Sequence, residues 1–105
     1  MKVISAEKPY IEAALHDLRS QTGEAIGLDS FKGFSVLLPA SDEFLAAYDK
    51  KAESTAYKWV TGSPDQAVLF PRMKRAQAVA LLKEGAETVM LFESSKRYYV
   101  MEVQQ

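Results

Sequence analysis

The chain has 105 residues, of which 48% are hydrophobic and 26% are charged, and its formal net charge is −1 at pH 7. This length and composition predict one soluble globular domain over residues 1–105, and the near-neutral charge disfavours a dedicated nucleic-acid-binding protein. The sequence contains no cysteine, no apolar run long enough to span a membrane and no signal-peptide pattern, so we expect a bacterial-style cytoplasmic protein without disulfides.

The first part of the chain predicts a strand followed by a helix. Residues 2–5, "KVIS", favour a short strand. Residues 8–23 predict an amphipathic helix, with Pro9 in its first turn and Gly23 just beyond its last turn. The apolar residues of this segment recur at the helical period and are expected to face the core: Ile11, Ala14, Leu15 and Leu18.

The middle of the chain predicts a loop, a strand and a second helix. Residues 24–33 contain two glycines and are typical of a loop. Residues 34–38, "FSVLL", form a continuous apolar run that Pro39 closes, which indicates a buried strand. Ser41 is a suitable N-cap for a helix over residues 42–52, whose acidic residues would lie near its start and whose lysines near its end.

The last part of the chain predicts a hairpin, a third helix and a second hairpin. Residues 56–71 favour a hairpin, because turn residues separate two strand-like runs. Residues 73–85 predict a helix that ends at a glycine and has an apolar side of Ala76, Val79, Ala80 and Leu82. With a final hairpin over residues 89–103, the order is β-α-β-α-β-β-α-β-β. The expected fold is an α+β domain with a mostly antiparallel sheet of five to six strands and three helices.

The C-terminal hairpin, "VMLFESSKRYYVMEV", is apolar on both faces. A loop of "SSKR" pairs Glu93 with Tyr98 across the turn. This register predicts that one face, made of Met90, Phe92, Tyr99, Met101 and Val103, is core. The second face carries Val89, Leu91, Tyr98 and Val100. Full burial of one large apolar side chain stabilises a protein by roughly 1.5–3 kcal/mol, so the second face also has too much apolar area to be left in water.

Two covers for the second face are consistent with the sequence. A helix or the 24–33 loop could fold across it within the chain. Alternatively, another chain could cover it, either a second copy in a homodimer or a different protein. The residues expected to bind such a partner lie on this face or on neighbouring predicted strands: Val89, Leu91, Tyr98, Val100, Tyr57 and Trp59.

The sequence therefore favours a small protein-interaction module and not an enzyme. The single histidine, His16, has only Glu12 beside it on the same helix, which is too few ligands for a metal site. Asp42 and Glu43 are explained by their expected place in the first turn of a helix. Because no phosphate loop and no nucleophile–base pair is recognisable, we expect no catalytic residue, no metal and no cofactor.

The alternative function is a nucleic-acid-binding accessory protein. Residues 72–75, "RMKR", place cations at a predicted helix start, where they oppose the helix dipole by a few tenths of a kcal/mol, so a use in binding an anion is suggested. The tip of the last hairpin adds two more cations. The expected contacts to an anion or nucleic acid are Arg72, Lys74, Arg75, Lys96 and Arg97. A protein partner is favoured over this alternative because no RNA-binding signature is present.

Overall fold

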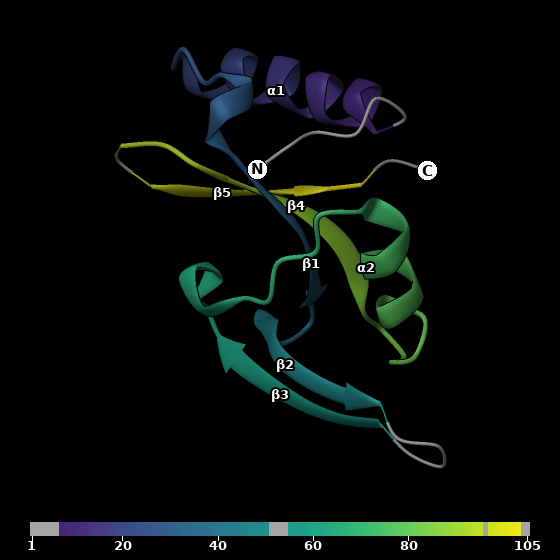
Figure 1. Cartoon of the computed structure of the whole chain (residues 1–105). Helices are drawn as coiled ribbons and strands as arrows, with labels where there is room; N and C mark the ends of the chain where they lie inside the picture. The colour runs from purple at the N-terminus through teal and green to yellow at the C-terminus, as the bar shows by residue number, and fades with distance from the viewer. Residues whose placement is uncertain (1–6, 51–54, 96, 104–105) are drawn as a thin grey trace.

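The computed structural model describes residues 7–50, 55–95 and 97–103. Its elements in chain order are α1 (Lys8–Thr22), the short 3-10 turn η1 (Leu28–Ser30), β1 (Phe31–Leu38), β2 (Glu43–Lys50), β3 (Thr55–Thr61), the short 3-10 turn η2 (Pro64–Gln66), α2 (Met73–Ala80), β4 (Glu87–Glu93) and β5 (Tyr98–Glu102). The strands form one antiparallel sheet in the order β3-β2-β1-β4-β5 (Figure 1). The α+β class is confirmed, with five strands and two helices in the described residues; the strand predicted at residues 2–5 lies outside them.

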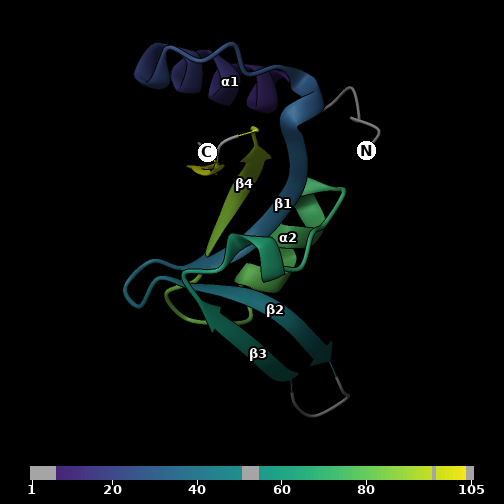
Figure 2. The ribbon, with the colours of Figure 1, turned by 90° about the vertical axis from the view of Figure 1, so that its left-hand side faces the viewer.

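The two ends of the sheet lie in different surroundings. Figures 1 and 2 place α1 over β4 and β5, whereas β2 and β3 lie at the opposite end of the molecule. Helix α2 packs against β1 and β4, between these two ends. Within the described ranges, no helix is long and apolar enough to cross a membrane.

Helix α1 confirms the sequence prediction in detail. Its N-terminal turn contains Pro9, and Gly23 follows its last residue with a φ of 72°, where its N–H donates to the Arg19 carbonyl at 2.9 Å. This left-handed position is one that glycine occupies without steric cost. The predicted apolar stripe is buried: Ile11, Ala14, Leu15 and Leu18.

The helix predicted over residues 42–52 is wrong, because residues 43–50 form strand β2. Residues 39–42 make a turn, and Asp42 takes a φ of 54°, so the chain reverses into a hairpin instead of starting a helix at Ser41. A strand points successive side chains to opposite faces. Phe44 and Leu45 are both buried, each in a different apolar cluster. Tertiary burial on both faces therefore outweighs the local helix propensity of "EFLAAYDK".

The hairpin predicted over residues 56–71 is also wrong in its pairing. Strand β3 forms as expected, but it pairs with β2 and not with the following apolar run. Strands β1 and β2 pair only at Leu37 with Phe44 and at Leu38 with Glu43. Beyond these pairs, the later segment hydrogen-bonds to both strands: Phe70 exchanges bonds of 2.7 and 2.9 Å with Phe34, and the Val68 N–H donates to the Leu45 carbonyl at 2.7 Å. Residues 68–70 are thus inserted between β1 and β2.

Helix α2 forms where the third helix was predicted, but it is shorter. It ends at Ala80, and a series of turns carries the chain to β4. Ala76, Val79 and Ala80 are buried, as expected. Leu82 is 44% exposed and Leu81 is 87% exposed. The prediction that Leu82 contributes to the core is therefore wrong, because the helix ends before this residue can turn toward the sheet.

The predicted register of the C-terminal hairpin is confirmed, since Glu93 pairs with Tyr98, Phe92 with Tyr99 and Met90 with Met101. The face that contains Met90 and Phe92 belongs to the main core, together with buried residues of α1 and α2. Tyr99, Met101 and Val103 pack against the same cluster. The sheet therefore keeps its principal core under the two helices.

Candidate functional site

The second face of the C-terminal hairpin is covered in part by the chain itself. Val89 and Leu91 are 0% and 1% exposed, and with Phe44 of β2 they form a second buried cluster. Three half-buried residues pack against this cluster, namely Leu37, Val60 and Ala67. The cover comes from the β1–β2–β3 end of the sheet and from the segment after η2, not from a helix or from residues 24–33. Val89 and Leu91 are therefore not available to a partner in this fold.

A buried hydroxyl holds this cover in place. Ser35 of β1 is opposite Val89 and fully buried, and its Oγ donates to the Val68 carbonyl at 2.7 Å. This bond joins the segment after η2 to the same face of the sheet that carries Val89 and Leu91. It satisfies the hydroxyl, which would be costly to bury without a partner.

The remaining part of the second face lies on β5. Val100 is opposite Leu91 but is 36% exposed, and Tyr98 is half-buried. The difference arises because the cover reaches β4 and leaves the outer strand partly open. Of the predicted partner-binding residues on the hairpin, these two keep accessible surface.

Tyr57 and Trp59 do not join this surface. Both lie on β3, which is separated from β5 by three strands. Their rings are 5.8 Å apart and pack partly against the main core. The expectation that they share one patch with Tyr98 and Val100 is wrong, because β3 pairs with β2 and not with the C-terminal hairpin.

Two of the predicted anion-contacting residues at α2 contact the chain itself. Arg72 Nε lies 3.9 Å from Glu7 Oε1, and the same carboxylate oxygen accepts a hydrogen bond of 3.0 Å from the Met73 N–H. Glu7 is 5% exposed, so a buried carboxylate supplies the negative charge that the start of α2 favours. Arg75 donates to the Tyr48 hydroxyl at 2.8 Å and lies 5.9 Å from the centre of its ring.

The remaining predicted cations do not converge with these arginines. Lys74 is exposed at the start of α2, whereas Arg97 is exposed at the tip of the β4–β5 hairpin. Figure 1 shows this tip on the opposite side of the molecule from α2. Lys96 lies outside the described residues. The function of these cations in nucleic-acid binding stays a prediction, with Lys74 and the α2 arginines separated from Arg97.

The outer edge of β5 carries backbone groups directed away from the sheet. No described strand pairs with this edge, because β5 is last in the strand order. The Val103 N–H donates to the Thr88 carbonyl at 3.2 Å. Hydrogen-bonded and non-bonded pairs alternate along an antiparallel ladder. The register therefore places the backbone groups of Tyr99 and Met101 toward β4, and those of Tyr98, Val100 and Glu102 toward the open edge.

One groove lies beside this edge, and a second lies between α2 and the paired ends of β4 and β5. The first, the α1 groove, has a volume of about 260 Å³ and lies between α1 and β5, where Tyr10, Asp17 and Gln21 face Val100, Met101 and Glu102. The second, the α2 groove, has a volume of about 480 Å³ and lies near the end of α2, where its lining includes Gln77, Leu81, Glu87, Thr88, Glu102 and Val103. Glu102 lines both grooves, so they meet at the end of β5.

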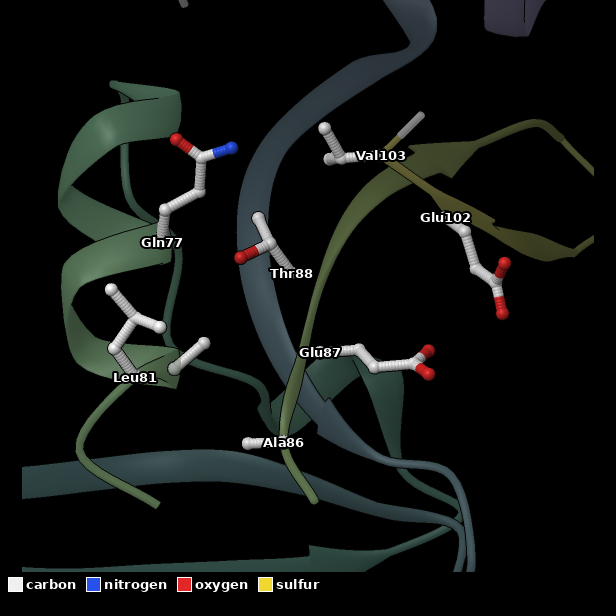
Figure 3. A pocket seen from close by; sticks show the side chains of 8 residues that line it. Gln77, Leu81, Ala86, Glu87, Thr88, Glu102 and Val103 are labelled. Atoms are coloured by element: carbon white, nitrogen blue, oxygen red, sulfur yellow. The ribbon is translucent and has the colours of Figure 1, made fainter. Parts of the chain in front are cut away.

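Two carboxylates of the residues that line the α2 groove lie on one side of the hairpin. Figure 3 shows Glu87 and Glu102 extending to the same side, while Gln77 projects from α2 on the other side of β4. Glu102 is opposite Val89, two residues from Glu87, so the two carboxylates are diagonal neighbours on one sheet face. The described residues that line the two grooves include Asp17, Glu87 and Glu102 but no lysine, arginine or histidine. The groove lining at the Glu102 end of β5 is therefore acidic, whereas the exposed Arg97 places a cation just before Tyr98 at the other end.

The other end of β5 has a hydrogen-bonded tyrosine. A hydrogen bond to the Glu93 carboxylate raises the pKa of Tyr98 above its usual value of 10.0, and burial and the charges of Glu93 and Asp65 act in the same direction. Glu93 also forms an ion pair with Lys32, with 3.4 Å between Nζ and Oε1. Tyr98 is thus held beside the Glu93 carboxylate at the start of β5.

Several residues of the site were missed by sequence reasoning. Tyr10, Asp17 and Gln21 lie seven and four residues apart on α1, next to its buried stripe. Their period was recognisable, but nothing local indicated which strand α1 would cover. Glu87 was missed because β4 was expected to begin at Val89. In the part of the chain that the structure describes, no three His, Cys, Asp or Glu residues are grouped as metal ligands.

Comparison with known proteins adds no identification. No family model, no curated protein and no solved structure matches this chain. A function for the edge of β5 is therefore argued from its own geometry and charge.

Proposed function

We propose that this chain is a non-enzymatic protein-interaction module that binds an extended segment along the outer edge of β5. The observation that supports the proposal is the outward direction of the backbone groups of Tyr98, Val100 and Glu102, beside the α1 groove. An extended segment added as a strand would pair with these groups. Its side chains would alternate between the two faces of the sheet, one of which adjoins the α1 groove.

The sequence of β5 supports this use of its edge. Soluble proteins protect exposed sheet edges with lysine, proline or bulges, because unpaired edges recruit other strands. β5 reads "YYVME" and pairs with β4 without a bulge. The other outer strand, β3, carries the exposed Lys58, and β2 is bulged against it between Leu45 and Ala47. Of the two outer strands, β5 is the one without a lysine, a proline or a bulge.

Accessible apolar surface on the same strand supports the proposal as well. Val100 is 36% exposed in the middle of β5, and Tyr10 is 40% exposed on the neighbouring helix. Aromatic and aliphatic side chains at the centre of a contact region are those that contribute most to binding between proteins. A bound strand would cover both residues while its backbone completes the hydrogen bonds of the edge.

The variant Val100→Pro tests the backbone pairing. Proline lacks the N–H, and the Val100 N–H is directed away from β4, so the ladder between β4 and β5 loses no bond. The matched control Val100→Thr changes the side chain but retains the N–H. Circular dichroism and urea unfolding check that both variants fold.

A library of random peptides displayed on phage, selected on the wild-type protein, provides the ligands. We expect the recovered peptides to bind wild type and Val100→Thr similarly, and to bind Val100→Pro about tenfold or more weakly. Amide hydrogen exchange on the wild-type complex should also show protection at Val100 and Glu102. The proposal is overturned if no peptide is recovered, or if the peptides bind Val100→Pro as well as wild type and leave these amides unprotected.

A further inference from the structure

The charge of the β5 edge indicates the chemistry of its partner. We propose that the edge accepts an extended segment of a different protein that carries lysine or arginine, and this inference rests on the proposed function. The described lining of the two grooves contains Asp17, Glu87 and Glu102 and no cation. Electrostatic complementarity selects partners more strongly than it adds affinity, so the acidic groups at the Glu102 end of β5 favour a segment with a basic residue there over neutral or acidic ones.

One face of the added strand would meet Glu102 and Val100. The side chains of Tyr98, Val100 and Glu102 share one sheet face, because they alternate with Tyr99 and Met101. A residue of the partner opposite Glu102 would lie close to that carboxylate, while Glu87, one strand further away on β4, adds its negative charge from a greater distance. This position therefore favours lysine or arginine, whereas the position opposite Val100 favours an apolar residue.

The other face of the added strand would meet α1. A partner residue opposite Met101 points into the α1 groove, whose lining includes Tyr10, Asp17 and Gln21. The groove has a volume of about 260 Å³, which suits a single side chain. A long side chain with a cationic end fits this position, because its carbon chain can contact Tyr10 and Met101 while its charge lies near Asp17.

A second copy of this chain offers less opposite charge than a basic segment. A twofold interface repeats its own surface, so Asp17 and Glu102 would occur on both sides of the contact. In an antiparallel pairing centred on Val100, Glu102 of one copy would lie opposite Tyr98 of the other, with Arg97 of that copy next to it. A segment with one cation opposite Glu102 and another near Asp17 supplies more complementary charge, so the edge favours a different protein over self-association.

Three synthetic peptides test the inference by fluorescence anisotropy. The first alternates Val and Lys, the second alternates Val and Glu, and the third repeats the first with N-methyl groups on every second residue. N-methylation removes the backbone donors that strand pairing needs but keeps the positive charge, so it separates pairing from non-specific attraction. We expect the Val/Lys peptide to bind wild type about fivefold or more tightly than either of the other peptides.

Charge-reversal variants locate the contact. Glu102→Lys should weaken the Val/Lys peptide about fivefold or more and should bind the Val/Glu peptide better than wild type does. The control Glu12→Lys makes the same change in net charge on the exposed side of α1, away from the grooves, and should leave both affinities within about twofold. Circular dichroism checks that both variants remain folded.

The possible results separate the two proposals. If the Val/Glu peptide binds wild type as well as the Val/Lys peptide, and Val100→Pro weakens both, strand addition stands and the basic partner is wrong. If light scattering over a dilution series shows a wild-type dimer that Val100→Pro dissociates, a second copy occupies the edge and the basic partner is again wrong. If the N-methylated peptide binds as tightly as its parent, or if no peptide binds, strand addition itself is refuted.

Discussion

The two strands of the C-terminal hairpin have similar apolar sequences but very different environments. β4 reads "ETVMLFE", and every residue from Thr88 to Phe92 is buried. β5 reads "YYVME", and none of its residues is fully buried. Because the register pairs them residue by residue, the difference comes from position in the sheet and not from composition. β4 lies between β1 and β5, whereas β5 is the outermost strand.

The comparison shows that a strand with neighbours on both sides is buried more completely than an outermost strand. β4 has α1 and α2 over one face and the cluster around Phe44 over the other. That second cover reaches Leu91 but stops short of its partner Val100, which is 36% exposed. The same hairpin thus supplies both the centre of the core and the candidate binding edge. Three experiments test this division between β4 and β5.

The largest effect is expected from truncating the two residues that face each other across the hairpin. Leu91→Ala should lower the free energy of unfolding by about 2–5 kcal/mol, because it removes a fully buried side chain and leaves a cavity. Val100→Ala should lower it by less than about 1 kcal/mol, because part of that side chain is already in water. Urea unfolding measures both. Equal losses would show that Val100 is as well covered as Leu91 and would remove the basis for a binding edge.

A smaller effect is expected from releasing the cover over β4. Ser35→Ala removes the donor to the Val68 carbonyl and should cost about 1–3 kcal/mol. It should also speed amide exchange at Val89 and Leu91 more than at Tyr99, since the cover lies over β4. The control Ser63→Ala removes an exposed hydroxyl bond to the Thr61 carbonyl and should change stability by less than about 0.5 kcal/mol. Unchanged exchange in Ser35→Ala would mean that the cover does not depend on this bond.

The smallest effect is a change in a single ionisation on β5. The hydrogen bond to Glu93 raises the pKa of Tyr98, so Glu93→Gln should lower that pKa toward its usual value of 10.0. Since the pKa in the folded protein is above the unfolded value, the stability that this interaction contributes is fully present below about pH 10 and is lost as the pH rises through the folded pKa. Ultraviolet titration of wild type and Glu93→Gln, with Tyr98→Phe as reference, measures the shift. A pKa that is unchanged in Glu93→Gln would place Tyr98 away from this carboxylate.

The sequence by itself determined the elements whose signals are local. The period of Ile11, Leu15 and Leu18 with the flanking Pro9 and Gly23 predicted α1, because a helix is specified by contacts within a few residues. The register of the C-terminal hairpin followed from its turn length and from the alternation of its side chains, and Glu93 pairs with Tyr98 as predicted. The composition of this hairpin also indicated correctly that both of its faces need cover.

Only the tertiary structure decided how that cover is made. The segment around Phe44 has helix-forming residues, but burial of Phe44 and Leu45 on opposite faces requires a strand, and such burial depends on distant β1, β3 and Val68. The insertion of residues 68–70 between β1 and β2 likewise has no local signal, since its hydrogen-bond partners Phe34 and Leu45 lie more than twenty residues earlier. For the same reason, the sequence shows that Val100 is apolar but does not show that it is exposed at an open edge. Its exposure depends on which strand lies outermost, and that order is set by long-range pairing.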